Sequence, residues 1–263
     1  MDKKWNLKIL NKGDHAEIWI YGNIIDDADG AFAKLLKLDD GYVFPSKIRE
    51  QLDEIGDKPV DIYIASDGGD VNAGMAIANI IKRLNGQTTA YIDSWAASIA
   101  SVIALACDRV VMPENTFIMI HNPACICVGI AADMRKTADL LDTIRDSIVD
   151  TYCEHCNTEI PVDVVKQYVP DFPDKNGEAE DMFMGLMDNE TWLTAADCKA
   201  IWTHVEVIEA SNKAVACYSG FKTAPEALHK PAEPAYPATV PKPEPVDYSS
   251  LIKEATEVLE HGN

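Results

Sequence analysis

Apolar and polar residues alternate along the first 25 residues, and this pattern predicts two strands. The segments W-N-L-K-I-L and A-E-I-W-I-Y-G-N-I each repeat with a period of two, and Gly-Asp between them is typical of a turn. Residues 26–45 are Asp-rich and mixed, so we expect a loop with a short helix there. Residues 44–56 have Pro-Ser at positions 45 and 46, end at Gly and place their apolar residues on one helical face, which predicts a short amphipathic helix.

A strand–turn–helix unit then occurs twice. Residues 59–65 form an apolar strand that leads into a D-G-G-D turn and a helix over 73–85. Residues 88–93 form the next strand, and the uncharged run 95–107 after it predicts a helix that is buried on all sides. Further elements are expected as strands at 108–112, 117–120 and 205–208 and as short helices at 160–169 and 194–202. This order predicts a layered α/β fold built from repeated ββα units.

The C-terminal half contains one long helix and a tail of different composition. Residues 129–157 carry an apolar stripe opposite a charged face, so this helix either covers the sheet or reaches another subunit. We divide the chain into a folded domain over 1–218, a proline-rich linker over 219–246 and a short amphipathic helix over 247–263. So short a helix has too little surface to fold alone, and we expect it to dock or to stay disordered.

Charge and cysteine content narrow the class of protein. The net charge of −20 gives no general attraction for nucleic acid or an anionic membrane, and we expect neither as a partner. No apolar run approaches the roughly 20 residues of a membrane span, and the N-terminus has no signal-peptide core. The seven scattered cysteines argue against a disulfide framework and for the cytoplasm. Cys125-x-Cys127 has an unusual spacing for structural zinc, and Cys153-Glu-His-Cys156 lies on a helical pattern, so we expect free thiols, no metal and no cofactor.

Three separated segments carry the groups that acyl transfer needs. Ser98 lies in A-A-S-I-A-S, His121 ends an apolar strand before Asn-Pro, and Gly68 and Gly69 precede both. A serine can supply the nucleophile, a histidine the general base, and glycine backbone the donors for an oxyanion. The segment D-N-E-T-W offers a carboxylate to orient the histidine.

These motifs resemble the ClpP serine peptidases. The resemblance rests on I-Y-I-A-S-D-G-G-D-V-N-A-G, A-A-S-I-A-S, V-M-P-E-N-T-F-I-M-I-H-N-P and E-T-W-L-T-A, which occur in the family's order over residues 16–210. It is greatest to the ClpP-related head maturation (prohead) proteases of phages, and it does not extend to the tail. The fold that it implies is the ClpP/crotonase-like α/β fold of repeated ββα units.

The resemblance implies a role for each matching residue. Ser98 is the expected nucleophile and His121 the expected base, whereas Ser101, His155 and His204 have no counterpart in the motifs, and helix packing suffices to explain Ser101. Glu190 is the expected orienting acid, with Asp188 as the alternative. The backbone N–H groups of Gly69 and Ile99 are the expected oxyanion donors, with Gly68 supporting the turn.

The implied function is an ATP-independent serine endopeptidase that cleaves phage scaffold or capsid proteins during head maturation. Its partners would be those polypeptides and further copies of the chain in a ring, in the host cytoplasm or inside the assembling head. Three alternatives stay open: a ClpP-type proteolytic subunit fed by an ATP-driven unfoldase, a crotonase-like acyl-CoA enzyme, and a catalytically silent structural component of the head.

Overall fold

The computed structural model describes residues 8–36, 41–52, 55–174 and 177–210. The chain divides into two compact units, Met1–His229 and Lys230–Asn263, and the second lies wholly outside the described residues. The predicted linker over 219–246 and terminal helix over 247–263 also fall outside them.

The described part of the first unit is built on one mostly parallel sheet. Its main path runs β1-β2-β4-β5-β6-β9, while β3 pairs with β2, and β7 joins β5 to β8. The strands are β1 (Lys8–Lys12), β2 (His15–Ile24), β3 (Tyr42–Val43), β4 (Val60–Gly69), β5 (Thr88–Ala97), β6 (Arg109–Pro113), β7 (Phe117–Ile120), β8 (Thr191–Thr194) and β9 (Val205–Ile208). Only the β1–β2 and β7–β8 pairs of these named strands are antiparallel. The α/β fold predicted from the sequence is therefore confirmed.

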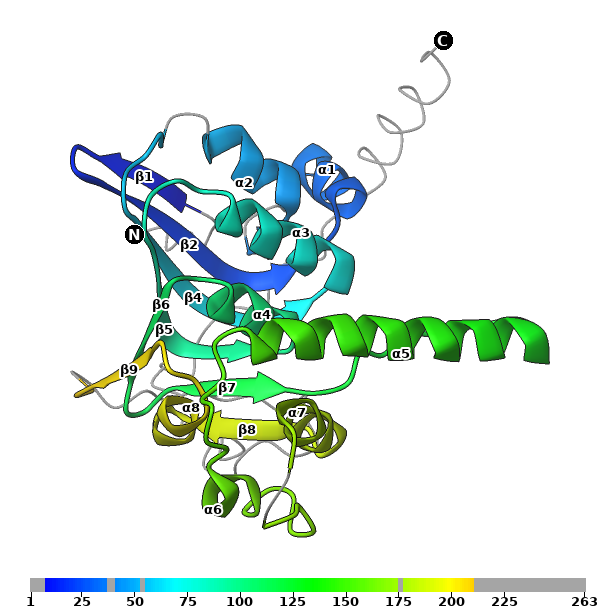
Figure 1. The fold of residues 1–263 in the computed structure, drawn as a ribbon. Coiled ribbons are helices and arrows are strands. Elements are labelled where there is room, and N and C mark those ends of the chain that lie inside the picture. Colours follow the sequence, from blue (N-terminus) through cyan, green and yellow to red (C-terminus); the bar gives the residue numbers. More distant parts are fainter. Residues whose placement is uncertain (1–7, 37–40, 53–54, 175–176, 211–263) are drawn as a thin grey trace, which may run out of the picture. The chain divides into compact units, whose positions relative to one another are not determined.

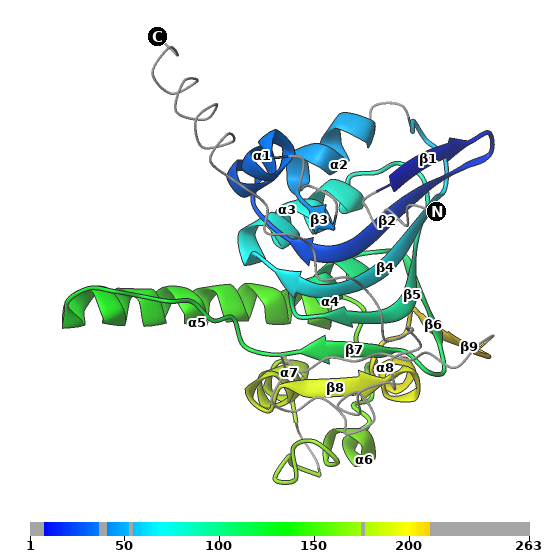
Figure 2. The same ribbon diagram turned by 180° about the vertical axis from the view of Figure 1, so that it is seen from behind.

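The described residues form eight helices beside this sheet. They are α1 (Asp27–Leu35), α2 (Pro45–Leu52), α3 (Val71–Lys82), α4 (Ile99–Leu105), α5 (Ala131–Cys153), α6 (Val162–Val165), α7 (Ala179–Asp188) and α8 (Ala195–Ile201). Figure 1 shows α3 and α4 in front of the sheet, and the view from behind in Figure 2 presents strands β2, β4 and β5 instead. In the described residues, no helix combines the length and apolarity needed to cross a membrane.

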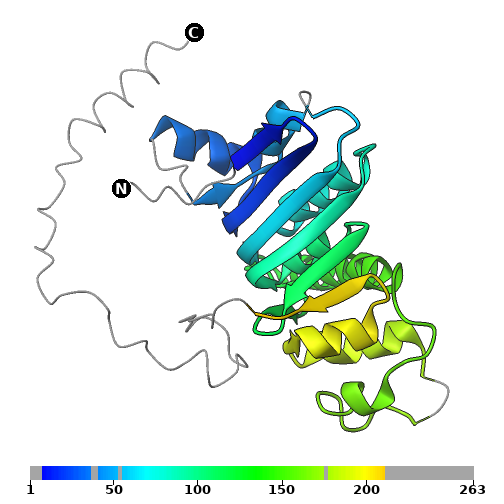
Figure 3. The same cartoon turned by 90° about the vertical axis from the view of Figure 1, so that its left-hand side faces the viewer.

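Strand β5 pairs with β4 along one edge and divides the hydrogen bonds of its other edge between two strands, and this fork positions the site. Its first half pairs with β6 through Thr89–Tyr91, and its second half pairs with β7 through Trp95–Ala97. In Figure 3 the strands β2, β4 and β5, coloured blue to green, lie side by side, and helices are seen behind them. Because β7 runs parallel to the end of β5, the residues that follow the two strands emerge at the same edge of the sheet.

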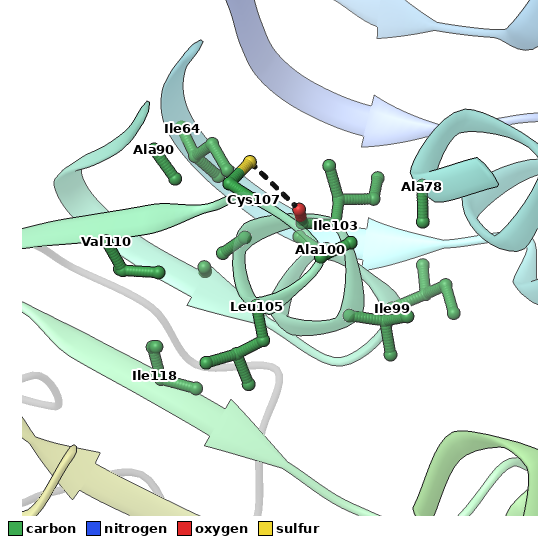
Figure 4. Close-up of a cluster of buried hydrophobic side chains, with 14 of the residues drawn as sticks. Ile64, Ala78, Ala90, Ile99, Ala100, Ile103, Leu105, Cys107, Val110 and Ile118 are labelled. Atoms are coloured by element: carbon green, nitrogen blue, oxygen red, sulfur yellow. Dashed lines mark hydrogen bonds between the residues drawn. The ribbon is translucent and has the colours of Figure 1, made fainter. Parts of the chain in front are cut away.

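The core is centred on α4, whose seven residues are all buried. Figure 4 shows Ile99, Ala100 and Ile103 of this helix among side chains from neighbouring strands and from α3, namely Ile64, Ala78, Ala90, Val110 and Ile118. The thiol of Cys107 donates a hydrogen bond to the carbonyl of Ile103 (3.5 Å). An uncharged sequence of small residues suits this position because the helix packs on every side.

Four local predictions were wrong. Residues 95–97 belong to β5, so the buried helix begins only at Ile99. The glycine pair ends β4 instead of forming a turn, and α3 begins at Val71, capped by Asp70. Helix α7 and strand β8 were not predicted at all. For the strands, pairing with a neighbouring strand extended or created regular structure that the local pattern did not indicate.

Candidate active site

Ser98 lies at the sharp junction between β5 and α4. Its backbone has φ 55° and ψ −130°, which is an unfavourable conformation for a residue with a side chain. The N–H of Ser98 donates to the carbonyl of Met119 on β7 (2.9 Å), and this bond extends the β5–β7 pairing by one residue. The side chain makes no capping bond to α4 and is therefore available to another group.

That group is His121, which directly follows β7. Its Nε2 lies 2.8 Å from Oγ of Ser98, within hydrogen-bond distance. Strands β5 and β7 pair in parallel up to Ala97 and Met119. Ser98 and His121 follow the ends of these two strands, and this explains their contact. The structure thus brings together the two residues that the motifs singled out.

Burial and a nearby charge act in opposite directions on the pKa of His121. The ring is partly buried, and loss of solvent lowers its pKa below the ordinary value, while the charge of Glu190 raises it. Burial is the larger effect, so the imidazole is neutral at pH 7 and can accept a proton.

Glu190 lies opposite His121 across the antiparallel β7–β8 pair. Thr191 pairs with Ile120, so the next position on each chain places Glu190 beside His121. The backbone of Glu190 has φ 47°, and its N–H donates to the carbonyl of Met187 (3.2 Å). This tight connection after α7 turns the chain so that the carboxylate is close enough to act electrostatically on the ring.

Asp188, the alternative acid, has a different partner. It is the exposed last residue of α7, and its Oδ1 accepts a hydrogen bond from Nδ2 of Asn122 (2.7 Å). Helix α7 ends at Asp188 and Glu190 has a positive φ, so the segment from 188 to 190 is not extended. The geometry therefore favours Glu190 as the acid next to the histidine.

The glycine pair lies against the serine junction. A Cβ at Gly68 would come within 2.7 Å of both the carbonyl oxygen of Ala97 and Cβ of Ser98, and within 3.2 Å of the backbone N of Ile99. A Cβ at Gly69 would lie 2.0 Å from the carbonyl oxygen of Ile24 on β2. Only glycine permits this close approach, and it brings the backbone of 68–69 next to the N–H of Ile99.

Two residues at this site were not recognised from the sequence. Ser101 is not merely packed in α4: its Oγ donates to the carbonyl of Ser98 (2.5 Å) and lies 2.7 Å from the hydroxyl of Tyr152 on α5. Tyr152 also lines the small pocket beside Ser98 and His121, together with Val71, Ile99, Val102, Pro123 and Ile148. A serine in a helix can bond back to a carbonyl one turn earlier, and that signal could have identified Ser101.

The remaining cysteines and histidines lie apart from this site. The described cysteines are all free thiols, and the described residues contain no group of three or more His, Cys, Asp or Glu side chains arranged for a metal ion. The rings of His155 and His204 are in contact, with centroids 4.3 Å apart and planes tilted by 36°. Burial and the neighbouring His155 lower the pKa of His204 to about 4.

A hydroxyl bonded to an imidazole, a carboxylate opposite the imidazole and glycine backbone alongside are together the arrangement found in serine hydrolases. The model of the Clp protease family matches residues 49–209. The chain belongs to the Clp protease family, whose members are serine peptidases.

Individual relatives are similar over part of their length. The chain is 30% identical to "ATP-dependent Clp protease proteolytic subunit 1" of Chlamydia pneumoniae over 146 residues, which are 54% of this chain and 66% of that protein. It is 34% identical to subunit 2 of Treponema denticola over 105 residues, 39% of this chain and 52% of that protein. The chain thus spans between about half and two thirds of these curated relatives. A ClpP1 variant from Listeria monocytogenes is 23% identical with a TM-score of 0.48, covering 74% of this chain and 92% of that one.

Proposed function

We propose that this chain is a serine endopeptidase in which Ser98, His121 and Glu190 form the catalytic triad. The observation that carries the proposal is the 2.8 Å contact between Oγ of Ser98 and Nε2 of His121. In the proposed reaction, the hydroxyl attacks the scissile carbonyl while its proton passes to Nε2. The same proton then goes to the leaving amine, and water repeats the sequence on the acyl-enzyme.

Glu190 and two backbone amides complete the proposed machinery. The carboxylate of Glu190 orients the ring of His121 and stabilises the imidazolium that forms when the proton is transferred. The N–H groups of Gly69 and Ile99 hold the negative oxygen of the tetrahedral intermediate. The close approach of Gly68 to Ser98 and to the backbone N of Ile99 supports this assignment, because it places the backbone of the glycine pair next to the nucleophile.

We further propose that the chain acts in phage head maturation without ATP, on scaffold or capsid polypeptides. Two features of the sequence support this assignment. The acid beside His121 is glutamate, as in the phage relatives that the motifs resemble, and a proline-rich tail follows the protease domain. Housekeeping proteolytic subunits rarely have such a tail.

A second candidate is a proteolytic subunit that receives substrates from an ATP-driven unfoldase. It is favoured by the names of the relatives, which are ATP-dependent Clp protease proteolytic subunits. The two candidates differ in whether the chain alone cleaves a folded or assembled substrate.

Assembly into a ring is part of the proposal. The segment before α5 and the first part of that helix expose large apolar side chains: Ile126 (97%), Val128 (93%), Ile130 (71%), Met134 (51%) and Leu140 (57%). In Figure 1, α5 extends past the edge of the sheet over much of its length, and only its last turns are buried. So many exposed apolar side chains in one segment favour a contact with another copy of the chain.

The proposed activity is tested with purified full-length chain and two substrates. Casein is the unfolded substrate, and scaffold protein assembled with capsid protein is the native one, each with and without an unfoldase and ATP. We expect cleavage of both by the chain alone and none by Ser98→Ala. Equal turnover by Ser98→Ala would refute the triad, and cleavage of the native substrate only with unfoldase and ATP would favour the second candidate.

A further inference from the structure

The peptide unit between Ser98 and Ile99 is fixed from its carbonyl side. The carbonyl oxygen of Ser98 accepts two hydrogen bonds from one residue, from the N–H of Ser101 (3.0 Å) and from its Oγ (2.5 Å). An ordinary helix end provides only the backbone bond. The second bond is notable because Ser98 has a backbone conformation that a residue with a side chain adopts only when its surroundings hold it.

Tyr152 determines the direction of the second bond. Its hydroxyl is 2.7 Å from Oγ of Ser101, and both side chains are buried, with 2% and 0% exposed. Because Ser101 uses its only hydroxyl proton on the carbonyl of Ser98, the hydroxyl of Tyr152 must be the donor to Oγ of Ser101. Burial raises the pKa of Tyr152 far above its ordinary value, so its hydroxyl keeps this proton at any working pH.

The ring of Tyr152 is itself held in place. It packs against Phe183 of α7 and against Trp202, with ring centroids 5.5 and 6.2 Å away. The backbone carbonyl of Tyr152 accepts a hydrogen bond from Nε1 of Trp202 (2.9 Å). The two successive hydrogen bonds that end at the carbonyl of Ser98 therefore start from a tyrosine that is packed in the core, where α5, α7 and the end of α8 meet.

A planar peptide links the carbonyl of Ser98 to the N–H of Ile99. In a trans peptide these two groups point in opposite directions, so a carbonyl held by two donors fixes the direction of the N–H. Hydrogen bonds to the carbonyl also polarise the peptide and make its N–H a stronger donor. The backbone N of Ile99 would lie 3.2 Å from a Cβ at Gly68, so this N–H group is next to the glycine pair.

We propose that Ser101 and Tyr152 are positioning residues that orient and polarise the Ile99 N–H toward the oxyanion. The inference rests on the proposed function and adds two residues to it. Neither side chain touches substrate in this role, because both act through the peptide bond between 98 and 99. Tyr152 acts only through Ser101.

The test compares Ser101→Ala, Tyr152→Phe and the double variant with the unaltered chain. Each substitution removes one oxygen and leaves the volume nearly unchanged. The substrates are a peptide ester and its thionoester, in which sulfur replaces the carbonyl oxygen and is a poor acceptor for N–H groups. Tyr168→Phe is the matched control, because it removes a hydroxyl that bonds to Asp197 (2.8 Å), away from Ser98.

We expect Ser101→Ala to lower kcat for the ester about 10-fold or more with little change in KM, since loss of a whole oxyanion donor costs about 10²–10³. Tyr152→Phe should lower it less, and the double variant should match Ser101→Ala. The thionoester should be affected much less than the ester, so the ratio of the ester rate to the thionoester rate should fall. Tyr168→Phe should leave this ratio unchanged.

Three results would overturn the inference: unchanged kcat in Ser101→Ala, equal losses on ester and thionoester, or the same change of ratio in Tyr168→Phe. Additive effects in the double variant would contradict the claim that Tyr152 acts through Ser101. The failure of the proposed function is a separate result, namely ester turnover that survives Ser98→Ala.

Discussion

Gly68→Ala should disable the site more than it destabilises the fold. A Cβ at this position would lie 2.7 Å from the carbonyl oxygen of Ala97 and 2.7 Å from Cβ of Ser98, and neither is the far end of a flexible side chain. Ordinary contact begins near 3.4 Å, so backbone must move by several tenths of an ångström. The residue also has φ 91°, which disfavours any side chain.

Gly41→Ala separates these two effects. Gly41 has φ 97°, close to that of Gly68, but no described atom lies within 4 Å of the position that an alanine methyl group would occupy there. Backbone conformation alone should cost about 1–2 kcal/mol of unfolding free energy in Gly41→Ala. Gly68→Ala should add about 1–3 kcal/mol for the forced contacts. Chemical unfolding of both variants measures the difference.

Peptidase assays on the same two variants give the decisive comparison. A displacement of about 1 Å at a reacting group can cost about 100-fold in rate. By the same reasoning, Gly68→Ala should lose about 100-fold in kcat/KM and Gly41→Ala should stay within about 3-fold of the unaltered chain. Full activity in Gly68→Ala would show that the glycine does not position Ser98, and an equal loss in Gly41→Ala would show that general destabilisation is the cause.

Three further predictions concern the charged groups. Glu190→Gln removes the charge that raises the pKa of His121, so the acid limb of the kcat/KM profile should move to lower pH while the plateau falls about 10²–10⁴-fold; an unmoved limb would contradict the assignment. Asp188→Asn should leave kcat/KM within about 3-fold, because this carboxylate bonds to Asn122; a loss like that of Glu190→Gln would make Asp188 the acid. His204 is neutral in the folded chain with a pKa of about 4, so its contribution to stability is complete above about pH 6.5 and falls as the pH drops toward 4. His204→Gln should flatten that part of the stability profile, and an unchanged slope in chemical unfolding would refute the reasoning.

Most strands of the sheet could be predicted from the sequence, because the pattern of apolar and polar residues that burial imposes repeats along the whole strand. The strand expected at 205–208 matches β9, and the helix expected over 194–202 matches α8, which Thr194 caps. Helix α7 was not predicted, although its buried residues Met182, Phe183, Leu186 and Met187 have helical spacing. The polar, proline- and glycine-containing residues just before it are typical of a loop, and they conceal where the helix begins.

Residues of the site could be predicted from the sequence only where the residue type and its local motif indicate the chemical role. Ser98 and His121 stand out by type and context, and the structure brings them together. The position of Glu190 depends on the register of β8 against β7, which no local pattern reveals. The bond between Ser101 and Tyr152 joins residues 51 positions apart through the packing of α5 on α4, so only the folded chain reveals it.

The central claim, that Ser98 is a nucleophile activated by His121, is tested most directly by fluorophosphonate labelling. The chain and its His121→Ala variant are treated with the reagent, and the modified peptide is located by mass spectrometry. We expect one modification, on Ser98, at a rate that falls at least about 100-fold in the variant, since general base catalysis contributes about 10²–10⁴-fold. A label on another serine, or equal rates in the two proteins, would contradict the account.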